Sequence, residues 1–106
     1  MCKNIINAAK MNDIVKVREC IDNGADVNEA DRDGFTALHW AARNSNVEIC
    51  TLLLKNNADV NKADRDGWTA LHYAASNGNV EICKLLGNKA DVNVTDGWFY
   101  CATLGR

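Results

Sequence analysis

The sequence GFTALHWAARNSNVEICTLL occupies residues 34–53, and GWTALHYAASNGNVEICKLL occupies residues 67–86. The two stretches begin 33 residues apart and are identical at 15 of their 20 aligned positions. The tetrapeptide ADVN ends at Asn28, Asn61 and Asn93, and alanine pairs recur at about the same period. A repeat of this length is typical of a stacked array of short units, in which each unit packs only against its neighbours.

The pattern within each unit predicts two helices followed by a projecting turn. Thr36 and Thr69 are suited to cap the first helix, because a threonine hydroxyl accepts a hydrogen bond from an orphan backbone N–H. Leucine and alanine then recur at helical spacing, and the polar residues at 44–46 and 77–79 interrupt this helix. A second apolar stripe follows it. The segment ADVNKADRDG after that stripe is rich in Asp, Asn and Gly, which predicts an extended turn.

The TALH motifs at residues 36–39 and 69–72 resemble the TPLH motif of the ankyrin repeat family, with alanine in place of proline. The alanine pairs, NVEI, the paired leucines and ADVN also stand at the family's offsets. The resemblance covers essentially residues 1–96 and implies an all-α solenoid of about three stacked repeats. We expect a single domain, 1–106, with these parts: an N-terminal capping repeat, 1–33; a full repeat, 34–66; a full repeat shortened at its end, 67–96; and an aberrant tail, 97–106.

The first unit differs from the others at one large position. Asn7 stands where the later units have Trp40 and Tyr73. We interpret this position as one that packs against the preceding repeat. A polar residue is then appropriate in the first unit, which has no preceding repeat and acts as a cap.

The tail GWFYCATLGR, residues 97–106, shares only its Gly-Trp start with the repeat pattern. One codon choice for this peptide, read from the next nucleotide, encodes DGFTALHWAA, which is the peptide at residues 33–42. One hypothesis is therefore that the tail is a frameshifted fourth repeat. The alternative is a divergent C-terminal cap. In either case the aromatic residues Trp98, Phe99 and Tyr100 either cover the end of the stack or form an apolar patch that drives self-association.

Composition excludes several classes of function. The chain has 106 residues, with 12 Lys and Arg against 14 Asp and Glu, and this net charge of -2 disfavours a nucleic-acid binder. Its apolar runs are far shorter than a membrane span, and no secretory signal is recognisable. Without such a signal, the five cysteines predict free thiols in a reducing compartment, so we expect a cytoplasmic or nuclear location.

The titratable residues give no pattern of catalysis or metal binding. His39 and His72 hold the same position in successive motifs, where the family resemblance implies a hydrogen bond that ties the helix start to adjacent turns. Cys50 and Cys83 also stand at matched positions, which predicts apolar packing. The DRDG turns lack the closing ligands of a calcium loop and predict a solvated turn of alternating charge. We therefore expect a protein that is not an enzyme and needs neither a cofactor nor a metal.

The resemblance implies a concave binding face built from the turn tips and the surface of the first helices. Aromatic residues and arginines on that face are the types that interface hot spots favour. We therefore predict non-catalytic binding of another protein, whose identity the sequence does not give. The predicted partner-binding residues are Arg32, Asp33, Phe35, Arg43 and Asn44 in the second unit, and Arg65, Asp66, Trp68, Ser76 and Asn77 in the third.

A second interpretation stays open, in which the chain is a truncated array with a structural or self-associating role through its C-terminal end. The protein would then be a monomer or a weak homodimer. The asparagines that end the ADVN motifs are expected to bond their own backbone in a turn, and the resemblance implies that this position can be hydroxylated. The expected positions are Asn28, Asn61 and Asn93.

The frameshift hypothesis predicts what the coding DNA contains. We expect its second reading frame, from the codon of Gly97 onward, to encode further repeat sequence that begins with a TALH motif. Sequencing the gene and its downstream region tests this directly. A second frame without repeat sequence would instead establish the divergent cap.

Overall fold

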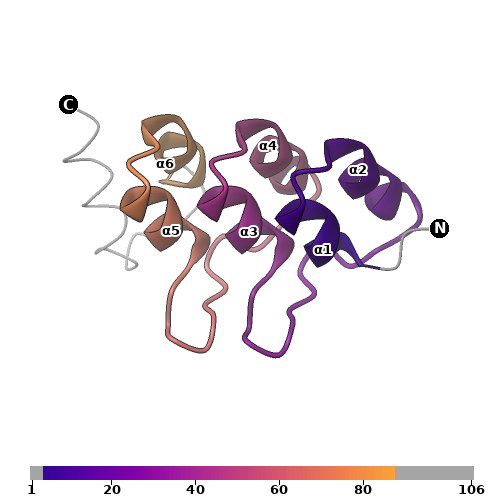
Figure 1. The fold of residues 1–106 in the computed structure, drawn as a ribbon, viewed down its shortest axis with the longest axis horizontal. Coiled ribbons are helices and arrows are strands. Elements are labelled where there is room, and N and C mark those ends of the chain that lie inside the picture. The colour runs from indigo at the N-terminus through magenta and orange to yellow at the C-terminus, as the bar shows by residue number, and fades with distance from the viewer. Residues whose placement is uncertain (1–3, 88–106) are drawn as a thin grey trace.

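The computed structural model describes residues 4–87, and all the regular secondary structure in this range is helical (Figure 1). Six helices follow one another as three pairs, which confirms the predicted all-α solenoid. None of these helices has the length and apolar character needed to cross a bilayer. The helices are α1 (Ile5–Lys10), α2 (Ile14–Asp22), α3 (Ala37–Arg43), α4 (Val47–Lys55), α5 (Ala70–Ser76) and α6 (Val80–Gly87).

The pairs stack so that equivalent helices lie side by side. The first helices, α1, α3 and α5, form one row, and the second helices, α2, α4 and α6, form another (Figure 1). The segments that join α2 to α3 and α4 to α5 loop out beyond the row of first helices. Each helix packs against its pair mate and against its neighbours in the row. Stability therefore comes from contacts between adjacent units.

The two helices of a pair are joined by a tight turn that the sequence specifies. After α3, the Ser45 N–H donates to the Ala42 carbonyl at 3.1 Å, and the Asn46 N–H donates to the Ala41 carbonyl at 2.9 Å. This is a Schellman motif, which places the residue after the cap in the left-handed region, and Ser45 has a φ of 57°. The Asn46 side chain then caps α4 by accepting from the Ile49 N–H at 3.0 Å.

Small side chains lie between the first helices of adjacent repeats. Ala9, Ala41 and Ala74 are fully buried, and their size lets the helices of this row approach closely. The second helices pack through larger residues at matched positions. Two of these, Ile49 and Ile82, are also fully buried. The predicted apolar faces of both rows are therefore confirmed.

The position held by Asn7, Trp40 and Tyr73 has the predicted role. Asn7 is exposed, whereas Trp40 and Tyr73 are half-buried and each contacts the preceding repeat. The Lys10 ammonium lies over the Trp40 ring, and the Phe35 ring lies 5.8 Å from that of Tyr73. The assignment of residues 1–33 as an N-terminal cap stays a prediction.

Side-chain amides also link neighbouring repeats. The Asn44 amide donates to the Lys10 carbonyl at 3.2 Å, and the Asn77 amide donates in the same way to the Arg43 carbonyl. Each amide therefore satisfies a carbonyl at the end of the preceding first helix, where the helix itself offers no partner. Both asparagines were predicted to bind a partner. Their amides hold the stack together, and partner binding by these residues stays a prediction.

Asn28 links two turns rather than closing its own. Its side-chain oxygen accepts from the Asp59 N–H at 2.6 Å, and its side-chain amide donates to the Asn57 carbonyl at 3.4 Å. The bond to its own turn comes instead from Asp26, whose carboxylate accepts from the Asn28 N–H at 2.9 Å. The expectation that Asn28 bonds its own backbone is therefore wrong, because the equivalent turn of the next repeat lies beside it. Asn93 lies outside the described residues.

The cysteines differ from their predicted state. Cys50 is a free thiol on α4, and burial raises its pKa to about 12. Cys20 and Cys83 are also buried, but each of them takes part in a disulfide bond. The prediction of five free thiols is wrong for these two, because spacing along the chain does not show which sulfurs meet in space. The argument for a reducing compartment loses this support, and the location stays a prediction.

The left-handed backbone conformation of Ser45 predicts a stabilising substitution. Gly78 occupies the place of Ser45 one repeat later, with a φ of 67°. A side chain in this region costs about 1 kcal/mol, so we expect Ser45→Gly to raise the free energy of unfolding by about that amount. Urea denaturation measures the change. Ser76→Gly, within helix α5, is the matched control and should instead lower stability. Equal effects of the two substitutions on the free energy of unfolding would contradict a conformational cost at Ser45.

Candidate binding face

Four aromatic rings run in succession along the exposed side of the first helices and their turns. Trp40 on α3 lies 5.2 Å from Phe35, and Phe35 lies 5.8 Å from Tyr73 on α5. Tyr73 in turn lies 5.2 Å from Trp68. All three contacts are tilted, and aromatic pairs at such separations stabilise one another. We call these four rings the aromatic ladder, and the surface formed by α1, α3, α5 and the adjoining turns the ladder face.

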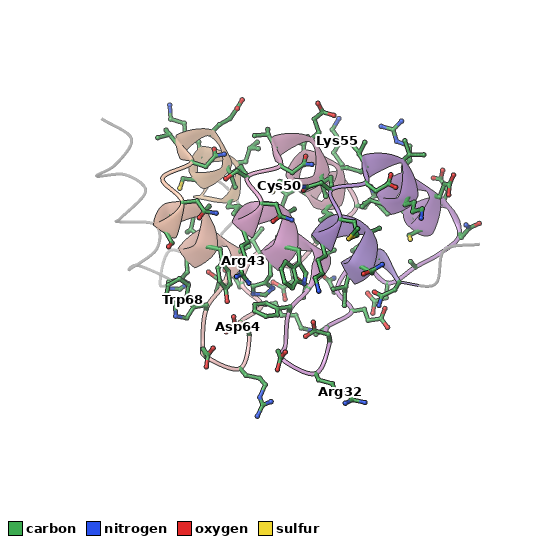
Figure 2. All side chains as sticks on the ribbon, in the orientation of Figure 1. Arg32, Arg43, Cys50, Lys55, Asp64 and Trp68 are labelled. Carbon is green, nitrogen blue, oxygen red and sulfur yellow. The ribbon has the colours of Figure 1, made fainter. Side chains whose placement is uncertain are left out.

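The ladder ends in an exposed ring. Trp68 is 40% exposed, the most of any described aromatic residue, while the other three rings are half-buried. Figure 2 shows Trp68, Arg43 and Asp64 on the side of the first helices and turns, and Cys50 and Lys55 on the other row. The ladder therefore holds Trp68 in place through its neighbours and presents it to solvent.

Two cations cover the opposite end of the ladder. The Lys10 ammonium and the Arg43 guanidinium each lie 5.2 Å from the centre of the Trp40 ring. Both side chains are exposed. A cation above an aromatic face is attracted by about 0.5–1 kcal/mol at an exposed site. The ladder face thus has a basic end at α1 and α3 and an aromatic end at α5.

His39 fixes the start of α3 and the turn that follows its repeat. Its Nδ1 accepts from the Thr36 N–H at 3.0 Å, so the proton of the neutral ring is on Nε2, which donates to the Trp68 carbonyl at 2.9 Å. Burial lowers the pKa of His39 below 6.5, although the bond to the Trp68 carbonyl opposes the shift. His72 repeats the first of these bonds with Thr69, at 3.0 Å. The predicted structural role is confirmed for His39.

Asp64 organises the second turn from inside. Its carboxylate accepts from the backbone N–H groups of Asp66 and Trp68, both at 2.9 Å, and from the Tyr73 hydroxyl. Burial opposes ionisation, but the hydrogen bonds from Tyr73 and the backbone outweigh it and lower the pKa of Asp64. Burial and the bond to Asp64 raise the pKa of Tyr73. Asp31 makes the same backbone bonds in the first turn, where Trp40 offers no hydroxyl.

The turn tips lie against each other through backbone. The Arg65 N–H donates to the Asp33 carbonyl at 2.9 Å. Gly34 has a φ of 82°, and a Cβ there would lie 2.9 Å from the Asp64 Cα, so only glycine fits. The Arg65–Asp33 ion pair spans 3.7 Å between side chains that are 72% and 67% exposed, and it contributes little to stability. The fixed backbone, rather than the ion pair, therefore positions these charges.

The structure brings most of the predicted binding residues onto one face. Phe35 and Asn44 are half-buried, and the Phe35 ring is an internal member of the ladder. The remaining predicted residues are exposed, namely Arg32, Asp33, Arg43, Arg65, Asp66, Trp68, Ser76 and Asn77. Figure 2 shows Arg32 at the tip of its turn. Trp98, Phe99 and Tyr100 lie outside the described residues, so self-association through them stays a prediction.

Two residues of this face, Trp40 and Tyr73, were not predicted to bind, whereas Lys10 is the first-unit counterpart of the predicted Arg43. Trp40, Tyr73 and Lys10 complete the ladder and its basic end. Trp40 and Tyr73 were interpreted only as packing residues. The signal that could have found them is their spacing, since each follows an aromatic turn residue by five positions in both repeats. No group of three or more His, Cys, Asp or Glu residues within 4–87 is arranged to hold a metal ion.

The Asp64 carboxylate predicts how stability depends on acid. Because its folded pKa lies below the reference value of 3.8, its contribution is complete above that pH and is lost as pH falls further. We expect Tyr73→Phe to lower the free energy of unfolding at neutral pH by about 1–2 kcal/mol and to weaken the loss on acidification. Chemical denaturation across the acid range measures both.

Asp66→Asn is the control for this experiment, because Asp66 is an exposed carboxylate of the same turn. It should retain the acid dependence of the unchanged protein. An acid dependence that is the same in Tyr73→Phe as in the unchanged protein would mean that the phenol does not support the ionised Asp64.

Comparison with known proteins gives a family for this arrangement. Residues 5–96 match the family model of ankyrin repeats in three copies. The chain is 49% identical over 51 residues to neurogenic locus notch homolog protein 2 of Homo sapiens, which covers 48% of this chain and 2% of that protein. It is 37% identical over 53 residues to ankyrin repeat domain-containing protein 39 of Homo sapiens. This match covers 50% of this chain and 29% of that protein.

A third relative carries the name of an enzyme. The chain is 38% identical over 52 residues to palmitoyltransferase Hip14 of Drosophila melanogaster, covering 49% of this chain and 8% of that protein. The chain thus spans less than a third of each of these relatives, so their activities are not transferred to it. The matched family, the six paired helices and the stacked turns lead to one conclusion: the chain belongs to the ankyrin repeat family.

Proposed function

We propose that this chain is a non-catalytic module that binds another protein on the ladder face. Ankyrin repeats are in general protein–protein interaction modules. The ladder face is the surface on which this chain exposes both an aromatic side chain and charged side chains. The observation that carries the proposal is the exposed Trp68 at the end of a fixed aromatic ladder. An aromatic side chain held rigidly at a surface loses little entropy on binding and is a typical hot-spot residue.

The charged turn tips support the same assignment. Arg32, Asp33, Arg65 and Asp66 are exposed, and the backbone bond between the turns fixes where they stand. A polar rim around an aromatic anchor is the usual composition of a protein interface. We further propose that the module acts in the cytoplasm or nucleus, requires no cofactor, and binds neither nucleic acid nor membrane.

The test uses a partner captured by the intact chain and then purified. We expect Trp68→Ala to weaken its binding at least tenfold in isothermal titration calorimetry, because truncation removes the exposed anchor. Arg65→Ala, at an exposed turn tip, should weaken binding by a smaller factor. Val15→Ala is the control, since Val15 is 63% exposed on α2, in the other row.

Thermal unfolding of each variant separates lost binding from lost structure, because Trp68 also packs on Tyr73. A folded Trp68→Ala protein that binds as tightly as the Val15→Ala protein would contradict binding on the ladder face.

A further inference from the structure

We infer that the basic end of the ladder face binds a carboxylate of an acidic, extended segment of the partner protein. The carboxylate would contact the Lys10 ammonium and the Arg43 guanidinium beside the Trp40 ring. This inference rests on the proposed function, because it names the chemistry of the partner on the same face.

The geometry places two like charges on one aromatic ring. Lys10 ends α1 and Arg43 ends α3, so they come from equivalent positions in adjacent repeats. Each charged group lies 5.2 Å from the Trp40 centroid, so the same ring holds both cations. Each such contact contributes about 0.5–1 kcal/mol at an exposed site.

No acidic side chain within residues 4–87 neutralises this pair. The single ion pair in that range joins Arg65 to Asp33 at the turn tips. In the adjoining turns the carboxylates of Asp31 and Asp64 accept hydrogen bonds from their own backbone N–H groups. These two carboxylates are thus engaged in turn structure, and the two cations offer donors to an incoming anion.

The Arg43 guanidinium suits a carboxylate in particular. Its planar fork of N–H donors pairs with two carboxylate oxygens, and the Lys10 ammonium adds a third donor. The net charge of -2 disfavours a long polyanion such as a nucleic acid. Met11, which follows Lys10 in the chain, and Trp68, at the other end of the ladder, are exposed apolar residues, so the segment should combine acidic with apolar residues.

Trp40 supplies a local reporter. Its indole N–H is buried and has no hydrogen-bond acceptor within residues 4–87. Its chemical environment must change when the two long side chains above the ring engage an anion. In a nitrogen–proton correlation spectrum each tryptophan gives one indole signal, and the Trp40→Phe variant identifies the signal that belongs to Trp40.

The experiment titrates the full chain with a short peptide that repeats Asp-Glu-Leu, and with the neutral counterpart that repeats Asn-Gln-Leu. We expect the acidic peptide to shift the Trp40 indole signal and the neutral peptide to leave it in place. Replacing both cations, by Lys10→Gln and Arg43→Gln, should weaken binding of the acidic peptide about five- to tenfold. Added salt should weaken it as well, because both charges are exposed.

The matched control replaces Arg18 on α2 and Lys55 on α4 by glutamine, which changes the net charge equally in the other row of helices. This control should bind the acidic peptide like the unchanged protein. Equal weakening by the control pair would show that net charge alone attracts the peptide, and would overturn the inference.

Other outcomes overturn the inference without touching the proposed function. Equal shifts from both peptides would leave ladder-face binding intact and exclude recognition of a carboxylate. A shift caused by raising the protein concentration alone would identify a second copy of the chain as the occupant. A shift from a single-stranded oligonucleotide but not from the acidic peptide would identify a phosphate ligand. The proposed function itself fails only if the captured partner binds the Trp68→Ala protein unchanged.

Discussion

His39 joins two repeats with a single imidazole. One ring nitrogen accepts from the backbone at the start of its own helix, and the other donates to the Trp68 carbonyl in the turn that follows. Both bonds require a neutral ring with its proton on Nε2, and burial maintains that state by lowering the pKa. Because this bond positions the Trp68 backbone, it also positions the aromatic end of the ladder face.

The same elements that hold the stack together present its surface. Asp64 closes the second turn by accepting from backbone N–H groups and from Tyr73, and Tyr73 is at the same time a rung of the ladder. Trp40 packs in the equivalent place, lacks the hydroxyl, and instead carries two cations. The same position therefore makes an internal polar contact in one repeat and supports a basic surface in the other, where Arg43 stands in place of Ser76. A solenoid tolerates such variation, because each repeat needs only to fit its neighbours.

Much of the fold could be predicted from the sequence, because its determinants are local. The threonine caps, the alanine positions and the polar breaks all act within a few residues, and a second copy 33 residues later confirms each one. Prediction was weaker for contacts between repeats. Asn28 was expected to bond its own turn, yet it bonds the next one, and the amides of Asn44 and Asn77 are engaged in stacking. The sequence of one repeat does not show which of its polar groups the adjacent repeat will contact.

The sequence by itself determined the helix pairs, their caps, the period of the array and the residue types on the predicted face. These follow from backbone hydrogen bonding and side-chain periodicity, which operate at short range along the chain. Only the tertiary structure decided that four rings form one ladder, that Lys10 and Arg43 share the Trp40 ring, and that Cys20 and Cys83 are disulfide-bonded while Cys50 is not. The contacts of Phe35 with Tyr73 and of Lys10 with Trp40 join residues far apart in sequence, and stacking the repeats sets the distance between them.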